Sequence, residues 1–213
     1  MNTLAKPKEN LIDPLILIPI LLLTSISALF IFSASNVLAS ESFNNPFFFI
    51  ERQVVAFALS LIIFSVFLFI PISFYRENGL LLFFLSAFLL ALVLIPGIGR
   101  EVNGSRRWLD LGFMNMQPSE VAKIFVPIYL CGYCLRRKEQ LESSWRGFLK
   151  PIVITSIITL LLFLEPDIGA IVVIFAIGIG ILFIGGAKLS QLGILTIIFV
   201  TLVSIFIYFN PER

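Results

Sequence analysis

The sequence contains no histidine, and only 13% of its 213 residues are charged. Histidine is the commonest general base and the usual zinc ligand, so its absence excludes Ser/His and Cys/His catalytic pairs. Soluble domains carry about a quarter charged residues, which excludes a large soluble domain here. Any chemistry must therefore rest on carboxylates, lysine, arginine or the backbone.

Cysteine and basic runs are also scarce. The two cysteines, Cys131 and Cys134, form a CxxC pattern inside an apolar run. We interpret the two cysteines as small polarizable residues at a helix contact rather than as a redox motif. The net charge is only +2, and the longest basic run is 136–138, so we expect no nucleic-acid partner.

Apolar residues are abundant instead, at 59% of the chain with a mean hydropathy of +1.04. A bilayer span needs roughly 20 mostly apolar residues. We predict an all-α, polytopic transmembrane helix bundle after an N-terminal segment at 1–14. The run from residue 15 is longer than the apolar core of a signal peptide, so we interpret it as a retained span. The seven predicted spans are about 15–35, 54–74, 80–98, 119–135, 151–164, 168–185 and 192–209.

The distribution of basic residues predicts the orientation, because cytoplasmic loops carry an excess of Lys and Arg. With the N-terminus in the cytoplasm, the inner side holds Lys6, Lys8, Arg76, Arg136, Arg137, Lys138, Arg146, Lys150 and Lys188. The outer side holds Arg52, Arg100, Arg106, Arg107 and Arg213. Seven spans then place the C-terminus outside.

The polar stretch 98–120 interrupts the apolar chain on the predicted outer side. Asn103 and Gly104 form a turn signal that could fold the stretch back over the membrane and bring Trp108 beside lipid. Its arginines either pair locally with Glu101 and Asp110 or receive phosphate, which guanidinium groups bind in a bidentate fork. An outer-leaflet lipid that carries phosphate would suit the second interpretation.

Two further sets of ionisable residues are candidates for a site. Glu120 and Lys123 lie three apart on one helix face. They form either a structural ion pair or the wall of a cavity, since charges within spans are costly. Glu165 and Asp167 flank Pro166 at a helix break, where Asp167 is either an N-cap or, with Glu165, part of an acid/base site.

Three motifs are found in this order: NGSRRWL at 103–109, QPSEVAK at 117–123 and EPDIG at 165–169. The series resembles the signature of the SEDS family of cell-wall polymerases. NPFFF at 45–49, RGFLKP at 146–151 and GAKL at 186–189 are similar to the FtsW branch more than the RodA branch. The resemblance runs from about residue 15 to residue 213.

The resemblance implies a peptidoglycan glycosyltransferase of the bacterial inner membrane that polymerises lipid II, the lipid-linked disaccharide-pentapeptide, at the division septum. It also implies partnership with a class B penicillin-binding protein and other divisome proteins, within membrane lipid. Arg107 and Trp108 match signature positions of the outer loop. The positions matching Arg52, Glu120, Lys123 and Asp167 belong to the family's polar cavity, and Glu165 lies in the same motif.

One departure from the family concerns catalysis. Relatives have about ten spans, and the aspartate assigned as catalytic base lies in a loop beyond the position of Arg213. No residue here inherits that role, so we expect this chain alone to be inactive. A fragment, a split gene product and a relic all stay open.

Cofactor use and two other functions also stay open. The sequence shows no cluster of metal ligands, and it does not decide whether a divalent cation takes part. A lipid II flippase could use the cavity around Glu120 and Lys123. A non-enzymatic scaffold could recruit the septal transpeptidase.

Overall fold

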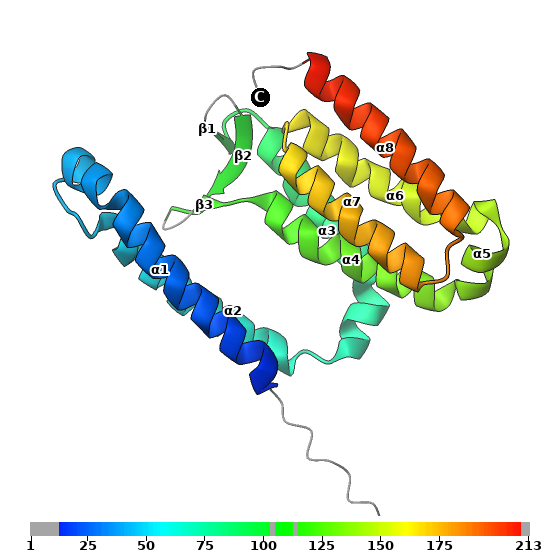
Figure 1. The fold of residues 1–213 in the computed structure, drawn as a ribbon, viewed down its shortest axis with the longest axis horizontal. Helices are drawn as coiled ribbons and strands as arrows, with labels where there is room; N and C mark the ends of the chain where they lie inside the picture. The colour runs from blue at the N-terminus through cyan, green and yellow to red at the C-terminus, as the bar shows by residue number, and fades with distance from the viewer. Residues whose placement is uncertain (1–12, 103–104, 113–114, 210–213) are drawn as a thin grey trace, which may run out of the picture. The chain divides into compact units, whose positions relative to one another are not determined.

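A computed structural model describes residues 13–102, 105–112 and 115–209. The chain forms two compact units, residues 1–71 and residues 72–213 (Figure 1). Each unit is described here by itself.

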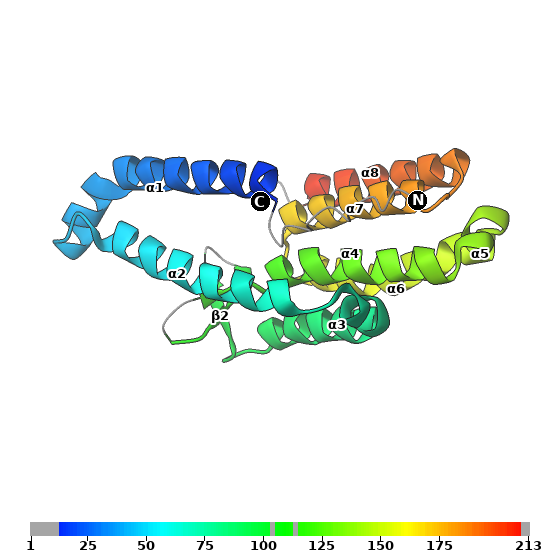
Figure 2. The same ribbon diagram turned by 90° about the horizontal axis from the view of Figure 1, so that it is seen from below.

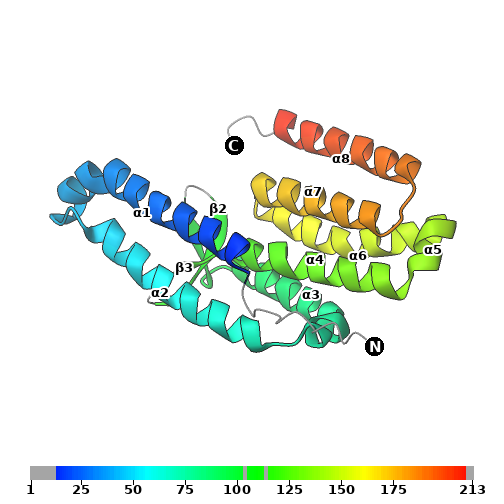
Figure 3. The ribbon, with the colours of Figure 1, turned by 60° about the horizontal axis from the view of Figure 1, so that its bottom comes forward.

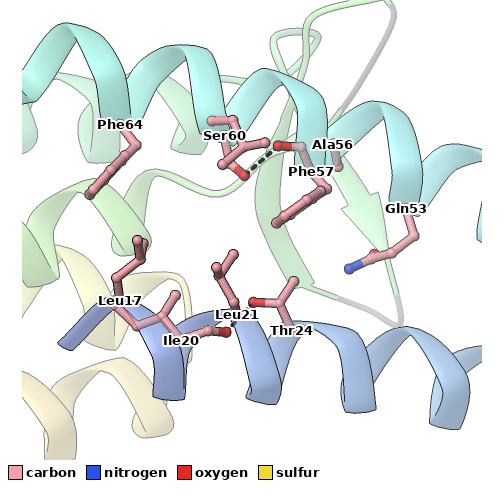
Figure 4. Close-up of a pocket in the computed structure, with 10 residues that line it drawn as sticks. Leu17, Ile20, Leu21, Thr24, Gln53, Ala56, Phe57, Ser60 and Phe64 are labelled. Atoms are coloured by element: carbon pink, nitrogen blue, oxygen red, sulfur yellow. Dashed lines mark hydrogen bonds between the residues drawn. The ribbon is translucent and has the colours of Figure 1, made fainter. Parts of the chain in front are cut away.

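Unit 1 is a helical hairpin of α1 (Pro14–Phe43) and α2 (Phe48–Phe69). Asp13 caps the start of α1 by accepting a hydrogen bond from the Leu15 amide at 2.9 Å, which satisfies a donor without an intrahelical partner. The hairpin turns after Asn44, whose φ of 51° ends α1 in a left-handed conformation. Side chains of the two helices face each other across a groove of about 470 Å³ (Figure 4).

Unit 2 contains the other helices and a small sheet. The helices are α3 (Ile72–Leu94), α4 (Pro118–Arg136), α5 (Lys138–Ser143), α6 (Trp145–Leu164), α7 (Ile168–Ile184) and α8 (Leu189–Phe209). The strands are β1 (Gly99–Val102), β2 (Ser105–Asp110) and β3 (Asn115–Met116). They are antiparallel in the order β1-β2-β3.

The core of unit 2 lies between α3, α4, α6 and α7. Figures 2 and 3 show α4 alongside α3, with α7 and then α8 beyond it. The ring of Phe83 from α3 lies 5.0 Å from that of Tyr129 on α4. Ile158 on α6 and Ile171 on α7 complete this buried cluster. The core fixes the helix ends that carry the polar motifs.

The membrane-protein prediction is supported by five helices that are long and apolar enough to cross a bilayer, namely α1, α2, α3, α6 and α8. The shorter helix α7 is apolar as well. Six of the seven predicted spans overlap one helix each, and the span at 54–74 covers most of α2 and the first residues of α3. Several limits differ. The helix α2 begins at Phe48, six residues before the predicted start at 54, and α6 begins at Trp145 rather than 151.

The predicted links between the first three helices were wrong in two places. The link expected at 75–79 lies within α3, and the chain turns instead at Ile70 and Pro71. Pro71 has no backbone N–H and disfavours helical geometry at the residue before it, which accounts for the break. The loop expected at 36–52 is mostly helical, because α1 continues to Phe43.

The prediction of an all-α fold is corrected by the sheet in the central polar stretch. At the end of β2, Leu109 is buried and Asp110 is exposed, because successive side chains of a strand point to opposite faces. Trp108 lies opposite Arg100 on β1. The turn predicted at Asn103 and Gly104 lies outside the described residues.

We expect Phe83→Ala to destabilise unit 2 by about 3 to 5 kcal/mol, because it opens a cavity in a fully buried contact. Thermal unfolding in detergent measures the change. Leu81→Ala on the same helix is the control, since Leu81 is 65% exposed, and it should have a much smaller effect. Equal losses in the two variants would contradict the position of the core.

Candidate functional site

The candidate site lies where β2 meets the break between α6 and α7. Arg107 on β2 donates from Nε to the carbonyl of Glu165 at 3.0 Å and from Nη2 to the carbonyl of Pro166 at 2.5 Å. The last carbonyls of a helix lack intrahelical partners, and Arg107 satisfies two carbonyls at this break. The sheet is thereby held against the helix break.

The side chain of Asp167 is the most highly connected carboxylate of the site. It caps α7 by accepting from the Ala170 amide at 3.1 Å, which confirms the N-cap interpretation. The same carboxylate accepts from Gln117 Nε2 and Ser119 Oγ, both at 2.9 Å. Asp167 therefore joins the start of α7 to the start of α4.

The neighbouring Glu165 has the opposite surroundings. It is completely buried, and neither carboxylate oxygen has a hydrogen-bond partner among the described residues. Burial raises the pKa of Glu165 to about 8, and the nearby charge of Asp167 adds to the rise while Arg107 opposes it. The neutral acid is therefore the main form near pH 7, which avoids a buried charge.

Glu120 and Lys123 form the ion pair that their spacing predicted, with Lys123 Nζ 2.6 Å from Glu120 Oε1. The Glu120 side chain is 61% exposed and that of Lys123 is 24% exposed. Since Ser119 bonds Asp167, the pair lies beside the Asp167 network on α4. The Glu120 carboxylate is the more exposed of the two groups and is available to a polar ligand.

The other predicted residues lie outside this network: some form local ion pairs on the sheet, and one belongs to unit 1. Arg100 lies 3.7 Å from Asp110, and Arg106 lies 3.4 Å from Glu101, so both arginines pair locally. Trp108 is partly buried in β2. Arg52 belongs to α2 of unit 1, where its guanidinium carbon lies 4.4 Å from the centre of the Phe48 ring.

Sequence reasoning assigned no role to Gln117 and Ser119, although both lie in the QPSEVAK motif. Neutral polar residues beside a proline gave no signal until the fold brought them to Asp167. Over the described residues, the structure shows no group of three or more His, Cys, Asp or Glu side chains arranged to hold a metal. Cys131 and Cys134 are both free thiols.

These features define a polytopic helical membrane protein with a polar site at one end of its bundle. The family model described as "Cell cycle protein", for FtsW, RodA and SpoVE, matches residues 13–213. The chain belongs to this FtsW/RodA/SpoVE family, which confirms the resemblance seen in its motifs.

Curated relatives agree with this assignment. A probable peptidoglycan glycosyltransferase FtsW of Nitrosococcus halophilus is 43% identical over 182 residues, which is 85% of this chain and 46% of that protein. The protein of the same name from Pseudomonas fluorescens is 38% identical, over 91% of this chain and 47% of its own length. The chain thus spans about half the length of the curated relatives it matches.

Solved structures show the same fold. One chain, from work titled "Structural coordination of polymerization and crosslinking by a peptidoglycan synthase complex", has a TM-score of 0.64 and 26% identity. The match covers 88% of this chain and 54% of that one. The rod shape determining protein RodA of Thermus thermophilus has a TM-score of 0.62 and 26% identity, over 84% of this chain and 58% of its own.

We expect Arg107→Ala to destabilise unit 2 by about 2 to 3 kcal/mol, since it leaves two carbonyls of the helix break without their charged donor. Arg106→Ala is a matched control at the adjacent position, where an exposed ion pair contributes about 1 kcal/mol or less. Thermal unfolding of the two variants in detergent provides the comparison. A loss for Arg106→Ala as large as that for Arg107→Ala would contradict the structural role of Arg107.

Glu165 should also make stability depend on pH. The pKa of Glu165 is raised from 4.5 to about 8 in the folded protein. The free energy of unfolding is therefore highest below pH 4.5, where the group is protonated in both states. It falls as pH rises from 4.5 through about 8, because the unfolded chain loses this proton first. We expect Glu165→Gln to remove this loss. Melting temperatures of both proteins between pH 5 and pH 9 measure it. Parallel pH profiles would show that Glu165 does not titrate as its burial predicts.

Proposed function

We propose that this protein acts as a peptidoglycan glycosyltransferase that polymerises lipid II into glycan strands during cell division. The carrying observation is the similarity of most of this chain, at 36 to 43% identity, to proteins named probable peptidoglycan glycosyltransferase FtsW. The exposed side chain of Glu120, which follows Ser119 of the Asp167 network, supports the proposal, because it gives an amphiphilic substrate a polar contact at one end of an apolar bundle.

Glu120 and Lys123 are proposed to bind the polar part of lipid II. The Lys123 ammonium can donate to a pyrophosphate oxygen in place of the Glu120 carboxylate, since the pyrophosphate and the carboxylate are both anionic acceptors. Among the described residues, Arg107 donates two hydrogen bonds, both to the helix break, and its other N–H groups are proposed to bind phosphate. Trp108 is proposed to line the same substrate path, with Glu165 and Asp167 at its base. Arg52, which lies on α2 of unit 1, is proposed separately as a substrate-binding residue.

The charge distribution of unit 2 supports the proposed orientation. The sheet and the α6–α7 break lie at one end, and α5 lies at the other (Figure 1). The α5 end carries more basic residues, and we place it in the cytoplasm by the positive-inside rule. We therefore propose seven spans with the N-terminus inside and the site outside, where lipid-linked precursor would be used.

A class B penicillin-binding protein and other divisome proteins are the proposed partners, at the septum of the inner membrane. The support is a structural neighbour that comes from work on polymerisation and crosslinking by a peptidoglycan synthase complex.

Direct binding of lipid II to the purified chain tests the proposal separately from catalysis. We expect saturable binding in detergent that is tighter than binding of undecaprenyl phosphate, which lacks the disaccharide-pentapeptide and one phosphate. Equal affinity for the two lipids would overturn a specific lipid II site. A flippase would be favoured instead by two results together: the protein moves lipid II across the membrane of vesicles, and its complex with the penicillin-binding partner does not polymerise lipid II.

Lys123→Ala should weaken lipid II binding about tenfold, because it removes a charge-assisted hydrogen bond of about 1.5 to 3 kcal/mol. Lys188→Ala is the control, because Lys188 lies in the turn before α8 at the opposite end of unit 2. The dissociation constants of both variants are the readout. Unchanged binding by Lys123→Ala would remove Lys123 from the proposed site.

A further inference from the structure

The end of unit 2 farthest from the candidate site carries a concentration of basic residues. Contacts between four elements bring this end together: Arg136 Nη1 of α4 donates to the carbonyl of Arg76 on α3 at 2.9 Å, and Gly186 after α7 lies against Glu142 of α5. The basic residues are Arg76, Arg136, Arg137, Lys138, Arg146, Lys150 and Lys188, and the acidic ones are Glu77, Glu139 and Glu142. Seven cations against three carboxylates leave a net charge of +4.

A polar groove of about 350 Å³ lies at the junction of α4 and α5 within this end, lined by residues 135–140. Within the described part of the chain, Arg137 has no ion pair and no side-chain hydrogen bond. Lys138 has only a long contact of 3.8 Å to Glu142, between two exposed side chains. Glu139 is the acidic residue of the lining and opposes anion binding. The groove thus has two cations that no local carboxylate neutralises closely.

Exposed apolar side chains occur at the same end of unit 2 as the groove. Leu135, which lines it, is 67% exposed, and Trp145 at the start of α6 is 50% exposed. Leu149 on α6, Ile184 at the end of α7 and Leu189 at the start of α8 are also exposed. A tryptophan beside cations and exposed aliphatic side chains is typical of the boundary between headgroups and acyl chains.

We infer that the groove at 135–140 binds the phosphate headgroup of an anionic phospholipid, with Arg137 and Lys138 as its ligands. Basic pockets beside membrane helices suit anionic headgroups. Leu135 in the lining and the exposed apolar side chains at the same end of the unit favour a lipid over a free phosphate ion, which has no acyl chains for them to contact. The inference is independent of the proposed glycosyltransferase activity, since it concerns the other end of the unit.

The test is titration of the purified chain in neutral detergent with short-chain phosphatidylglycerol and, separately, with phosphatidylcholine. The wild-type chain should bind phosphatidylglycerol at least about tenfold more tightly. Each basic residue near an anionic headgroup changes affinity about fivefold. The double variant Arg137→Gln/Lys138→Gln should therefore lose about 25-fold in affinity for phosphatidylglycerol and little for phosphatidylcholine.

The double variant Lys150→Gln/Lys188→Gln is the matched control, because it removes the same charge from the same end of the unit but outside the groove. It should change affinity less than about threefold. Equal losses in the two double variants would overturn the groove as a site and leave only general attraction. Equal affinity for the two lipids, or full displacement of phosphatidylglycerol by millimolar inorganic phosphate, would overturn a lipid headgroup site.

Discussion

The structure of the candidate site depends on the two hydrogen bonds from Arg107 to the carbonyls of Glu165 and Pro166. A helix break within or near a bilayer leaves backbone groups that water cannot satisfy, so another part of the protein must supply their partners. Arg107 does so from a strand 58 residues earlier in the chain. The small sheet, the α6–α7 break and the cap of α7 therefore form one connected structure.

Around that contact, two carboxyl groups separated by one residue have opposite environments. Asp167 receives three hydrogen bonds, from Gln117, Ser119 and the Ala170 amide, whereas the buried Glu165 carboxyl receives none among the described residues. Burial and proximity to Asp167 raise the pKa of Glu165. One carboxyl group thus holds α7 and α4 in place, and the other contributes a mainly neutral group to the packed interior.

The two ends of unit 2, where a bundle of a membrane protein meets water and headgroups, have different chemistry. One end carries a hydrogen-bonded network with local ion pairs at Arg100 and Arg106. The other end carries an excess of basic residues, in which Arg137 has no ion-pair partner among the described residues. The first arrangement suits a selective substrate site, and the second suits attraction to an anionic surface.

Sequence alone determined the membrane class, the helical character of each apolar run, the family and the Glu120–Lys123 pair, because hydropathy and helix spacing are local properties. It misplaced the link at 75–79, because Pro71 sets the break after α2, and it missed the sheet, because hydropathy does not encode strand pairing within a polar stretch. Only the tertiary structure decided that Arg107 binds helix carbonyls, that Gln117 bonds Asp167 and that Glu165 is buried. Those contacts join residues some 50 positions apart, and their partners are set by packing between helices that no local pattern encodes.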